Sequence, residues 1–246
     1  MAQRNALVTG GMGGLGEAIC MKLEKMGLRV VVTYSPGNLK HNEWLKEMEG
    51  QGFKFIAYPC DVADFDSCQK MIAQVAKDVG PVDILINNAG ITRDMTFKKM
   101  TKVDWDAVIR TNLDSVFNVT KPVVDGMVER GWGRVINVSS VNGSKGAFGQ
   151  TNYSAAKAGM HGFTKALALE VARKGVTVNT ISPGYIGTDM VRAIKPEVLE
   201  AIVKTIPVGR LGTPEEIGSM VAWLASEDAA FATGADFSLN GGLHMG

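Results

Sequence analysis

The sequence predicts an α/β fold with one doubly wound parallel sheet and helices on both faces. Short apolar runs recur along the chain and are typical of buried strands. They cover residues 6–8, 28–32, 53–58, 82–86, 134–138, 176–181 and 237–239. Segments with helical spacing alternate with these runs, and such alternation builds βαβ units. Because the first run leads into a glycine-rich turn, the arrangement expected is of the Rossmann type.

Helix starts support this order of elements. Thr101 followed by Asp104, and Thr213 followed by Pro214 and Glu216, are capping patterns. Pro122 lies inside the helical segment 104–130, where it should remove one backbone hydrogen bond and kink the helix. No linker or internal repeat interrupts the chain, and 246 residues suit one α/β domain. We therefore expect a single domain over residues 1–246.

The composition excludes several classes of protein. Hydrophobic residues make up 46% and charged residues 21%, the balance of an ordinary globular protein. Lys and Arg total 26 against 25 Asp and Glu, so no overall charge attracts nucleic acid or an anionic membrane. Met1 is followed within a few residues by the first strand, and no apolar run is long enough to span a bilayer. A cytoplasmic protein without nucleic-acid or membrane partners is expected.

The cysteines and histidines predict no metal site. Cys20, Cys60 and Cys68 are odd in number and form no Cys-x-x-Cys motif, which argues against a disulfide framework and against zinc. A reducing cytosol fits this pattern. The three histidines are too scattered for a metal centre. His161 is expected to serve packing or a subunit contact.

The glycine-rich turn after the first strand predicts a dinucleotide site. Glycines let the backbone approach a pyrophosphate, and the N-terminus of the following helix, expected to begin near Glu17, attracts it. The alternative is a merely tight turn. The residues expected to contact the cofactor here are Gly10, Met12, Gly13, Gly14, Leu15 and Gly16.

The end of the second predicted strand favours NADP(H) over NAD(H). NAD sites place an acid about 20 residues beyond the glycines, where it binds the ribose 2′-hydroxyl. This chain has Thr33, Tyr34 and Ser35 instead. Ser35 and the nearby Lys40 would tolerate or attract a 2′-phosphate. The alternative is that Lys40 and His41 are only a solvated helix start.

Two further strand ends are expected to contact the cofactor. Asp61 can accept a hydrogen bond from the adenine amino group while Val62 packs on the ring, although Asp61 would serve equally as a plain helix cap. After the fourth strand come Asn88, Ala89 and Gly90. The small residues permit close approach of the cofactor, and asparagine amides can tie neighbouring strands together.

A tyrosine–lysine pair supplies candidate acid–base groups. Tyr153 and Lys157 are four residues apart, which places both on one face of a helix. The pair alone is a weak signal that a surface helix would also produce. Ser140 lies at the end of an earlier strand, where strand ends and the next helix converge on one crevice. Asn112 in the preceding long helix completes a polar set.

In this order the motifs resemble those of the classical short-chain dehydrogenase/reductases, across essentially the whole chain. The resemblance implies that Asn112, Ser140, Tyr153 and Lys157 are catalytic, and that Tyr153 and Lys157 also bind the cofactor. It further implies cofactor contacts on the nicotinamide side, from Pro183, Gly184, Ile186 and Thr188. No metal is implied.

Within the family, residues 138–157 and 234–246 are similar to acetoacetyl-CoA reductases of polyhydroxybutyrate synthesis and to 3-oxoacyl-carrier-protein reductases. The first likeness implies reduction of acetoacetyl-CoA to (R)-3-hydroxybutyryl-CoA with NADPH. The second implies an acidic carrier protein, which Arg130, Arg173 and Lys174 would dock. A reductase of unrelated ketones and a non-catalytic NADP-binding scaffold are further alternatives. The family also implies a homotetramer. The chain departs from the family pattern at two places: many NADP-preferring relatives carry arginine at the position of Gly13, and acetoacetyl-CoA reductases tend to have arginine near Lys40.

The expected mechanism follows from the charge that develops on the carbonyl oxygen during reduction. Tyr153 donates a proton, and the ammonium of Lys157 lowers the pKa of that tyrosine. Ser140 hydrogen-bonds the substrate carbonyl. Lys157 also binds ribose hydroxyls, and Asn112 anchors a water that returns protons to Lys157.

Substrate contacts are expected from a loop and a lid. Ala147, Phe148 and Gln150 precede Tyr153 and offer an aromatic wall and an amide, and Tyr185 follows a strand end. Residues 187–211 are rich in apolar residues and include Arg192 and Lys195. This composition suits a lid over an acyl chain with an anionic carrier; an ordinary surface helix pair is the alternative. Asp94 contacts the carrier portion or caps a turn.

Overall fold

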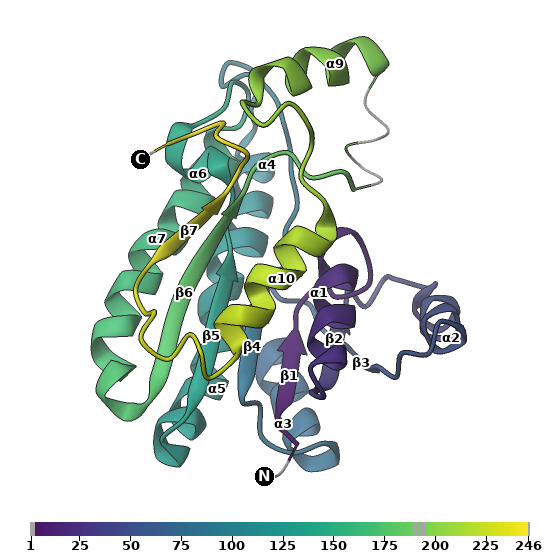
Figure 1. Cartoon of the computed structure of the whole chain (residues 1–246), viewed down its shortest axis with the longest axis vertical. Helices are drawn as coiled ribbons and strands as arrows, with labels where there is room; N and C mark the ends of the chain where they lie inside the picture. The colour runs from purple at the N-terminus through teal and green to yellow at the C-terminus, as the bar shows by residue number, and fades with distance from the viewer. Residues whose placement is uncertain (1–2, 189–190, 192–194, 246) are drawn as a thin grey trace.

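The computed structural model describes residues 3–188, 191 and 195–245, and it confirms the predicted α/β class (Figure 1). Within these described residues, seven parallel strands form one sheet in the order β3-β2-β1-β4-β5-β6-β7. Their bounds are β1 Asn5–Val8, β2 Arg29–Tyr34, β3 Ile56–Pro59, β4 Ile84–Asn87, β5 Gly133–Val138, β6 Val176–Pro183 and β7 Asp236–Leu239. Only the third strand begins clearly later than predicted. Phe53 donates its backbone N–H to Met48 O at 2.9 Å and so belongs to a turn.

Helices connect the strands and cover the sheet. They are α1 Gly14–Lys25, α2 His41–Gly50, α3 Phe65–Asp78, α4 Lys102–Ile109, α5 Ser115–Arg130, α6 Val141–Lys145, α7 Thr151–Val171, α9 Pro196–Thr205 and α10 Pro214–Ala225, with a π-helical segment at Arg110–Asp114 and a short 3-10 turn at Ala172–Lys174. Both predicted caps are confirmed. Thr101 Oγ1 accepts from the N–H of Asp104 at 3.2 Å, and Thr213 forms a complete capping box with Glu216.

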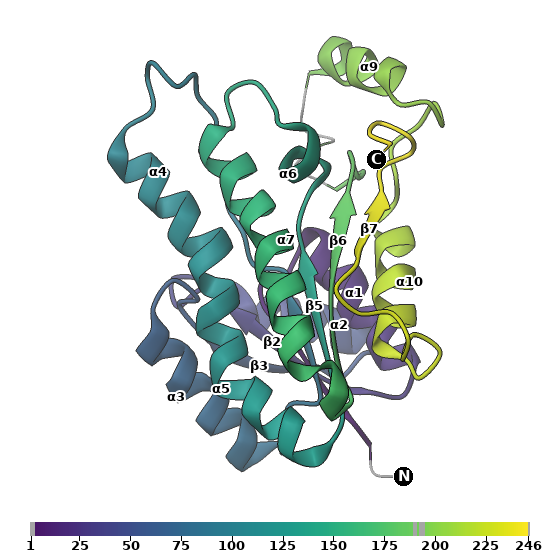
Figure 2. The same cartoon turned by 90° about the vertical axis from the view of Figure 1, so that its left-hand side faces the viewer.

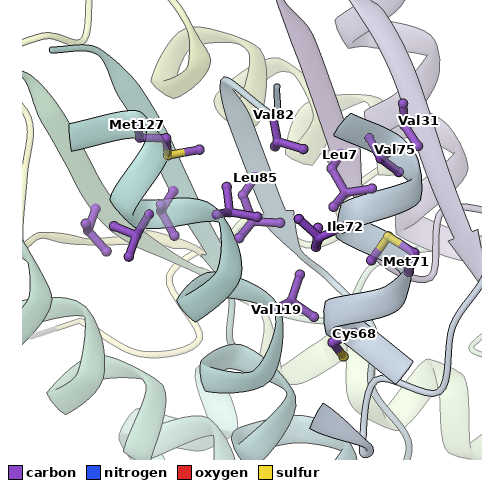
Figure 3. Packing of buried hydrophobic residues seen from close by; sticks show 14 of the residues in the cluster. Leu7, Val31, Cys68, Met71, Ile72, Val75, Val82, Leu85, Val119 and Met127 are labelled. Carbon is purple, nitrogen blue, oxygen red and sulfur yellow. The ribbon is translucent and has the colours of Figure 1, made fainter. Parts of the chain in front are cut away.

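Two apolar cores lie on opposite faces of the sheet because strand side chains alternate in direction. In β1, Leu7 joins the core under α3, α5 and α7, whereas Ala6 and Val8 join the core under α1 and α10. Figure 2 shows these two helical layers, and Figure 3 shows the first core closely, with Leu7 facing α3 residues such as Ile72. The sheet is thus buried on both sides, as parallel sheets are.

The long helix predicted over residues 104–130 is interrupted, but not at Pro122. Pro122 lies within the continuous α5, and the break in pattern is the π-helical segment Arg110–Asp114 between α4 and α5. Such segments bulge a helix locally and occur often at functional sites. This one contains Asn112, which is fully buried.

The sheet order creates a crevice at one edge. β1 pairs with both β2 and β4, so the connections leaving these strands run in opposite directions at this point. In open α/β sheets ligands bind outside the carboxyl ends of the strands at such a switch point. No helix in the described part of the chain is long and apolar enough to cross a membrane.

The turn from β1 into α1 is tighter than predicted. The helix begins at Gly14 rather than near Glu17, because the N–H of Gly16 already donates to Gly13 O at 3.0 Å. A Cβ on Gly16 would lie 2.3 Å from the carbonyl oxygen of Gly10, whereas a Cβ on Gly13 meets no atom within 4 Å.

Gly16→Ala is therefore expected to destabilise the fold, because the added methyl group overlaps a backbone oxygen. The expected loss is about 1–3 kcal/mol of unfolding free energy, or about 2–4 °C in Tm per kcal/mol for a chain of this size. Gly13→Ala is the matched control, since Gly13 has an extended backbone with φ 168°. Equal melting temperatures for the two variants would contradict the close approach at Gly16.

Candidate active site

A cavity of about 690 Å³ opens at the carboxyl ends of the strands. It brings together most of the site residues predicted from the sequence: Gly10, Gly13, Gly14, Leu15, Ser35, Asp61, Val62, Asn88, Ala89, Gly90, Ser140, Tyr153, Lys157, Pro183, Gly184, Tyr185, Ile186 and Thr188. The other predicted residues do not line it: Met12, Gly16, Lys40, Asp94, Asn112, Ala147, Phe148, Gln150 and Lys195. Arg192 lies outside the described residues.

The glycine turn presents backbone donors to this cavity. Gly10 and Gly14 have φ values of 61° and 53°, in the left-handed region that favours glycine. Gly13 caps α1 without any side-chain hydrogen bond, unlike Asp64 at the start of α3. The first N–H groups of α1 are thus not satisfied by a capping side chain, and they lie where a pyrophosphate can accept from them.

Hydrogen bonds tie the ends of β1 and β4 together behind the turn. Thr9 Oγ1 accepts from the N–H groups of Asn88 and Ala89, both at 3.0 Å. Asn88 Nδ2 in return donates to the carbonyl oxygens of Thr9 and Gly10, both at 3.0 Å. The strand-tying role expected of the asparagine amide is confirmed for Asn88, and Thr9 is a positioning residue that sequence reasoning missed.

The end of β2 forms the part of the cavity where a ribose 2′-substituent is expected. Tyr34 and Ser35 line it, and Tyr34 stacks on His41 with ring centroids 4.3 Å apart. Lys40 is exposed immediately before α2. Among the described residues that line the cavity, Asp61 is the only carboxylate, and it follows β3.

Asp61 does not cap α3, so the alternative interpretation of this residue as a plain helix cap is wrong. Asp64 is the cap, because its carboxylate accepts from the N–H of Ser67 at 2.7 Å. Asp61 instead accepts from the N–H of Ala63 at 3.0 Å in a local turn. That turn holds Asp61 and Val62 at the cavity wall.

The candidate acid–base groups converge at the other end of the cavity. Tyr153 and Lys157 lie on α7, and Ser140 lies just after β5 and hydrogen-bonds to Tyr153. Lys157 is buried and donates from Nζ to Val138 O at 2.7 Å. Its Nζ lies 5.5 Å from the centroid of the Tyr153 ring.

Burial dominates the protonation of this pair, which corrects one expectation. It raises the pKa of Tyr153 above the usual 10.0, the nearby Asp94 adds to this, and the hydrogen bond to Ser140 offsets it only in part. The pKa of Tyr153 is therefore raised overall rather than lowered as expected, because removing a phenolate from water costs more than the hydrogen bond to Ser140 recovers. Burial also lowers the pKa of Lys157 to about 8.

The Asn112 side chain hydrogen-bonds to the backbone of one residue through both ends of its amide. Its Oδ1 accepts from the N–H of Ile91 at 2.8 Å, and its Nδ2 donates to Ile91 O at 2.9 Å. The residue after Gly90 is thereby fixed to the π-helical segment. This geometry makes Asn112 a positioning residue.

A polar chain leads from the mouth of the site to Ser140. Gln150 Nε2 donates to Asp94 Oδ2 at 2.7 Å, and Gln150 Oε1 accepts from Asn142 Nδ2 at 2.9 Å. The N–H of Asn142 donates to Ser140 Oγ at 3.2 Å. Asp94 and Gln150 thus meet beside the site, whereas Phe148 is 94% exposed and points no aromatic surface into the cavity.

A partly buried network below the site was missed by sequence reasoning. Ser139 Oγ donates to Lys157 O at 2.9 Å and lies 3.0 Å from Nε2 of His161. The same nitrogen lies 3.3 Å from Ser182 Oγ, which donates to Asp236 Oδ1 at 2.7 Å. Because both hydroxyl hydrogens point elsewhere, His161 Nε2 acts as the donor. The only signal in the sequence was the spacing of four residues from Lys157.

The chain belongs to the short chain dehydrogenase family, whose family model matches residues 4–199. Three similar relatives cover nearly the whole chain. An acetoacetyl-CoA reductase of Cupriavidus necator is 65% identical over 246 residues, all of both chains. Nodulation protein G of Azospirillum brasilense is 59% identical over 99% of both chains. An acetoacetyl-CoA reductase of Allochromatium vinosum is 53% identical over 98% of this chain and 99% of its own.

The lowered pKa of Lys157 predicts a pH-dependent effect on stability. Between pH 8 and about 10.4, the usual lysine value, the unfolded chain binds a proton that the native chain lacks. The stability contributed by this site therefore rises with pH across that window, and below pH 8 the full cost of a buried ammonium remains.

Lys157→Met removes this titration. Without cofactor, the variant is expected to be more stable than wild type at pH 7. This difference in unfolding free energy should shrink by about 2–3 kcal/mol between pH 7 and pH 10. Urea unfolding of both proteins across this range measures it, and other titrating groups cancel in the difference. A stability difference that stays constant with pH would contradict the lowered pKa.

Proposed function

We propose that this chain reduces acetoacetyl-CoA to (R)-3-hydroxybutyryl-CoA with NADPH, as a supplier of polyhydroxybutyrate synthesis in the cytoplasm. One observation carries the reaction type: Ser140, Tyr153 and Lys157 meet in the same cavity as the glycine turn. The printed names of two relatives support the substrate. The three free thiols suit a reducing compartment.

The residues that line the cavity support the binding of a dinucleotide. The N–H groups at Gly13 to Leu15 suit the pyrophosphate, Asp61 and Val62 suit adenine, and residues 183–188 suit the nicotinamide. Bound NADPH supplies the hydride that reaches the carbonyl carbon. The hydroxyl of Ser35 and the nearby ammonium of Lys40 favour a 2′-phosphate over the bare ribose that an acid would select.

The polar groups supply the proton and stabilise the developing oxyanion. The raised pKa of Tyr153 keeps its hydroxyl protonated at neutral pH, as a proton donor must be. Ser140 donates a second hydrogen bond to the same carbonyl oxygen. As Tyr153 loses its proton, the ammonium of Lys157 stabilises the phenolate at short range inside a buried site.

The substrate thioester is proposed to lie under α9. Tyr185 faces the cavity and also lines a second, smaller apolar cavity of about 240 Å³ near the end of α9. Lys195 is exposed at the start of α9 and is placed to meet an anionic carrier. Asp94 and Gln150, which are linked to Ser140 through Asn142, are proposed to meet the thioester beside the cavity. We propose that residues 187–211 close over the acyl group as a lid.

The second candidate substrate is a 3-oxoacyl carrier protein, and the fold disfavours the docking cations first expected. Arg130 ends α5 just before β5, and Arg173 and Lys174 precede β6. All three therefore lie at the strand starts, whereas the cavity opens at the strand ends. Arg130 is also paired with Asp83, with 3.3 Å between Nη2 and Oδ1. This arrangement favours the CoA thioester.

Kinetics with paired substrates test the proposal. Oxidation of NADPH is expected with acetoacetyl-CoA, with a larger kcat/KM than with acetoacetyl-carrier protein or with NADH as the reductant. Preference for the carrier protein would move the enzyme to fatty-acid synthesis. Activity on simple ketones but on neither thioester would overturn the proposal that the substrate is a thioester.

Tyr153→Phe separates catalysis from binding. The variant is expected to lose at least about 100-fold in kcat, because general acid catalysis contributes on this scale. NADPH binding, followed by the fluorescence of the cofactor, should persist. Turnover close to that of wild type would refute the role of Tyr153, and turnover lost together with cofactor binding would point to a structural effect.

We also propose a homotetramer, in which α5 and α7 pack between subunits. Phe117 on α5 and Leu169 on α7 are exposed in the single chain, by 52% and 86%. Apolar side chains of this size on neighbouring helices suit an interface. Light scattering is expected to give about four times the 26.3 kDa of one chain, consistent with closed symmetry. A monomeric mass would contradict this assembly.

A further inference from the structure

Two cysteine thiols lie next to each other behind the adenine end of the cavity. Cys60 follows β3 and Cys68 lies on α3, and their Sγ atoms are 3.8 Å apart. Both side chains are buried, and Figure 3 shows Cys68 at the edge of the core beneath α3. Cys20, the third cysteine of the chain, belongs to the core on the opposite face of the sheet.

The pair supports the wall that the cofactor is expected to touch. Cys60 itself lines the cavity, next to Asp61 and Val62. The Cys68 Sγ lies 3.7 Å from the carbonyl oxygens of Asp61 and Val62, and its single hydrogen is shared among these two oxygens and Cys60 Sγ. Among the described contacts, one other side chain hydrogen-bonds to Val62 O: Asn118 Nδ2 donates to it at 3.0 Å. A chemical change at these thiols therefore reaches the adenine wall directly.

The two thiols differ in reactivity. The hydrogen bond from Cys68 lowers the pKa of Cys60, and a weaker one from Ser67 adds to this. The same hydrogen bond, together with burial, raises the pKa of Cys68. Burial also raises the pKa of Cys20. Cys60 lines the cavity whereas Cys68 does not, so an oxidant in the cavity reaches Cys60 first; its lower pKa acts in the same direction because the thiolate is the nucleophile. Cys68, at 3.8 Å, is placed to resolve the product.

We propose that Cys60 and Cys68 are an oxidant-sensitive dithiol, which a peroxide converts to a disulfide and which a bound dinucleotide protects. The protection rests on the proposed use of the cavity for the cofactor, whereas disulfide formation does not. Residues 60 and 68 then form a modification site outside the acid–base groups.

The chemistry balances in two steps. The Cys60 thiolate attacks one oxygen of hydrogen peroxide, breaks the O–O bond and releases hydroxide, which leaves a sulfenic acid. The Cys68 thiol then attacks the sulfur of that sulfenic acid and water departs. Two thiols and one peroxide thus give one disulfide and two waters. The peroxide is the two-electron oxidant, and the sulfur pair is oxidised.

Disulfide formation changes the adenine wall. The sulfurs must approach from 3.8 Å to about 2.05 Å. Cys68 also loses the single hydrogen that it shares between Asp61 O and Val62 O. The segment at Asp61 and Val62 loses these contacts, and the oxidised protein is expected to bind NADPH several-fold more weakly. Conversely, a bound cofactor covers Cys60 and slows its oxidation.

Mass spectrometry of the full-length wild-type protein tests the site. Dilute hydrogen peroxide is expected to remove about 2 Da from the intact chain, and peptide mapping under non-reducing conditions should show Cys60 linked to Cys68 with Cys20 unmodified. Saturating NADP⁺ should slow this reaction several-fold. Cofactor binding is measured in the same samples by calorimetry, so a lack of protection can be told from a failure of NADP⁺ to bind.

Variants assign the two roles. Cys68→Ser should give no linked peptide and should accumulate a sulfenic acid at Cys60 that dimedone traps. Cys20→Ser should still form the linkage. A linked peptide that forms equally fast with NADP⁺ bound would overturn the protection by cofactor. Absence of the Cys60–Cys68 peptide, or oxidation that reaches Cys20 first, would overturn the dithiol itself.

Discussion

The hydrogen bonds between Thr9 and Asn88 are the constraint on which the site depends. They join the carboxyl ends of β1 and β4, the strands at which the direction of the connections reverses. The same amide holds Gly10 O, so it also fixes the turn that leads into α1. Parallel strands that end at one edge can gather residues far apart in sequence. The hydrogen bonds between Thr9 and Asn88 hold these strand ends in a fixed arrangement, which gives the cavity a defined shape.

Burial sets the chemistry inside that cavity. Because Tyr153 is removed from water, its hydroxyl keeps its proton, and because Lys157 is removed from water, its ammonium is less stable than on a surface. The carbonyl of Val138 and the hydroxyl of Ser140 compensate only in part. The protonation of Tyr153 and Lys157 is therefore set by their removal from water as much as by their hydrogen bonds. Below these groups, Ser139 contacts His161 and donates a hydrogen bond to the backbone carbonyl of Lys157, which fixes the position of that residue on α7.

The fold could be predicted from the sequence because each pattern that indicates it lies within one short segment of the chain. Strands buried on both faces leave continuous apolar runs, and the glycine turn follows the first of them. Features that depend on distant contacts could not be predicted in this way. The π-helical segment is fixed by the contact of Asn112 with Ile91, the Tyr153 pKa by burial, and the thiol pair by the packing of α3 against the end of β3. The capping role of Asp64 rather than Asp61 likewise required the observed backbone.

Hydrogen–deuterium exchange with and without NADP⁺ tests the central claim most directly, namely that one dinucleotide contacts all of these strand ends. The account predicts slower exchange of backbone N–H groups in peptides that contain Leu15, Val62 and Ala89. Peptides from the strand starts, such as the turn Ala172–Lys174, should be unchanged. Protection limited to one of the three segments, or found mainly at the strand starts, would contradict the cavity as the cofactor site.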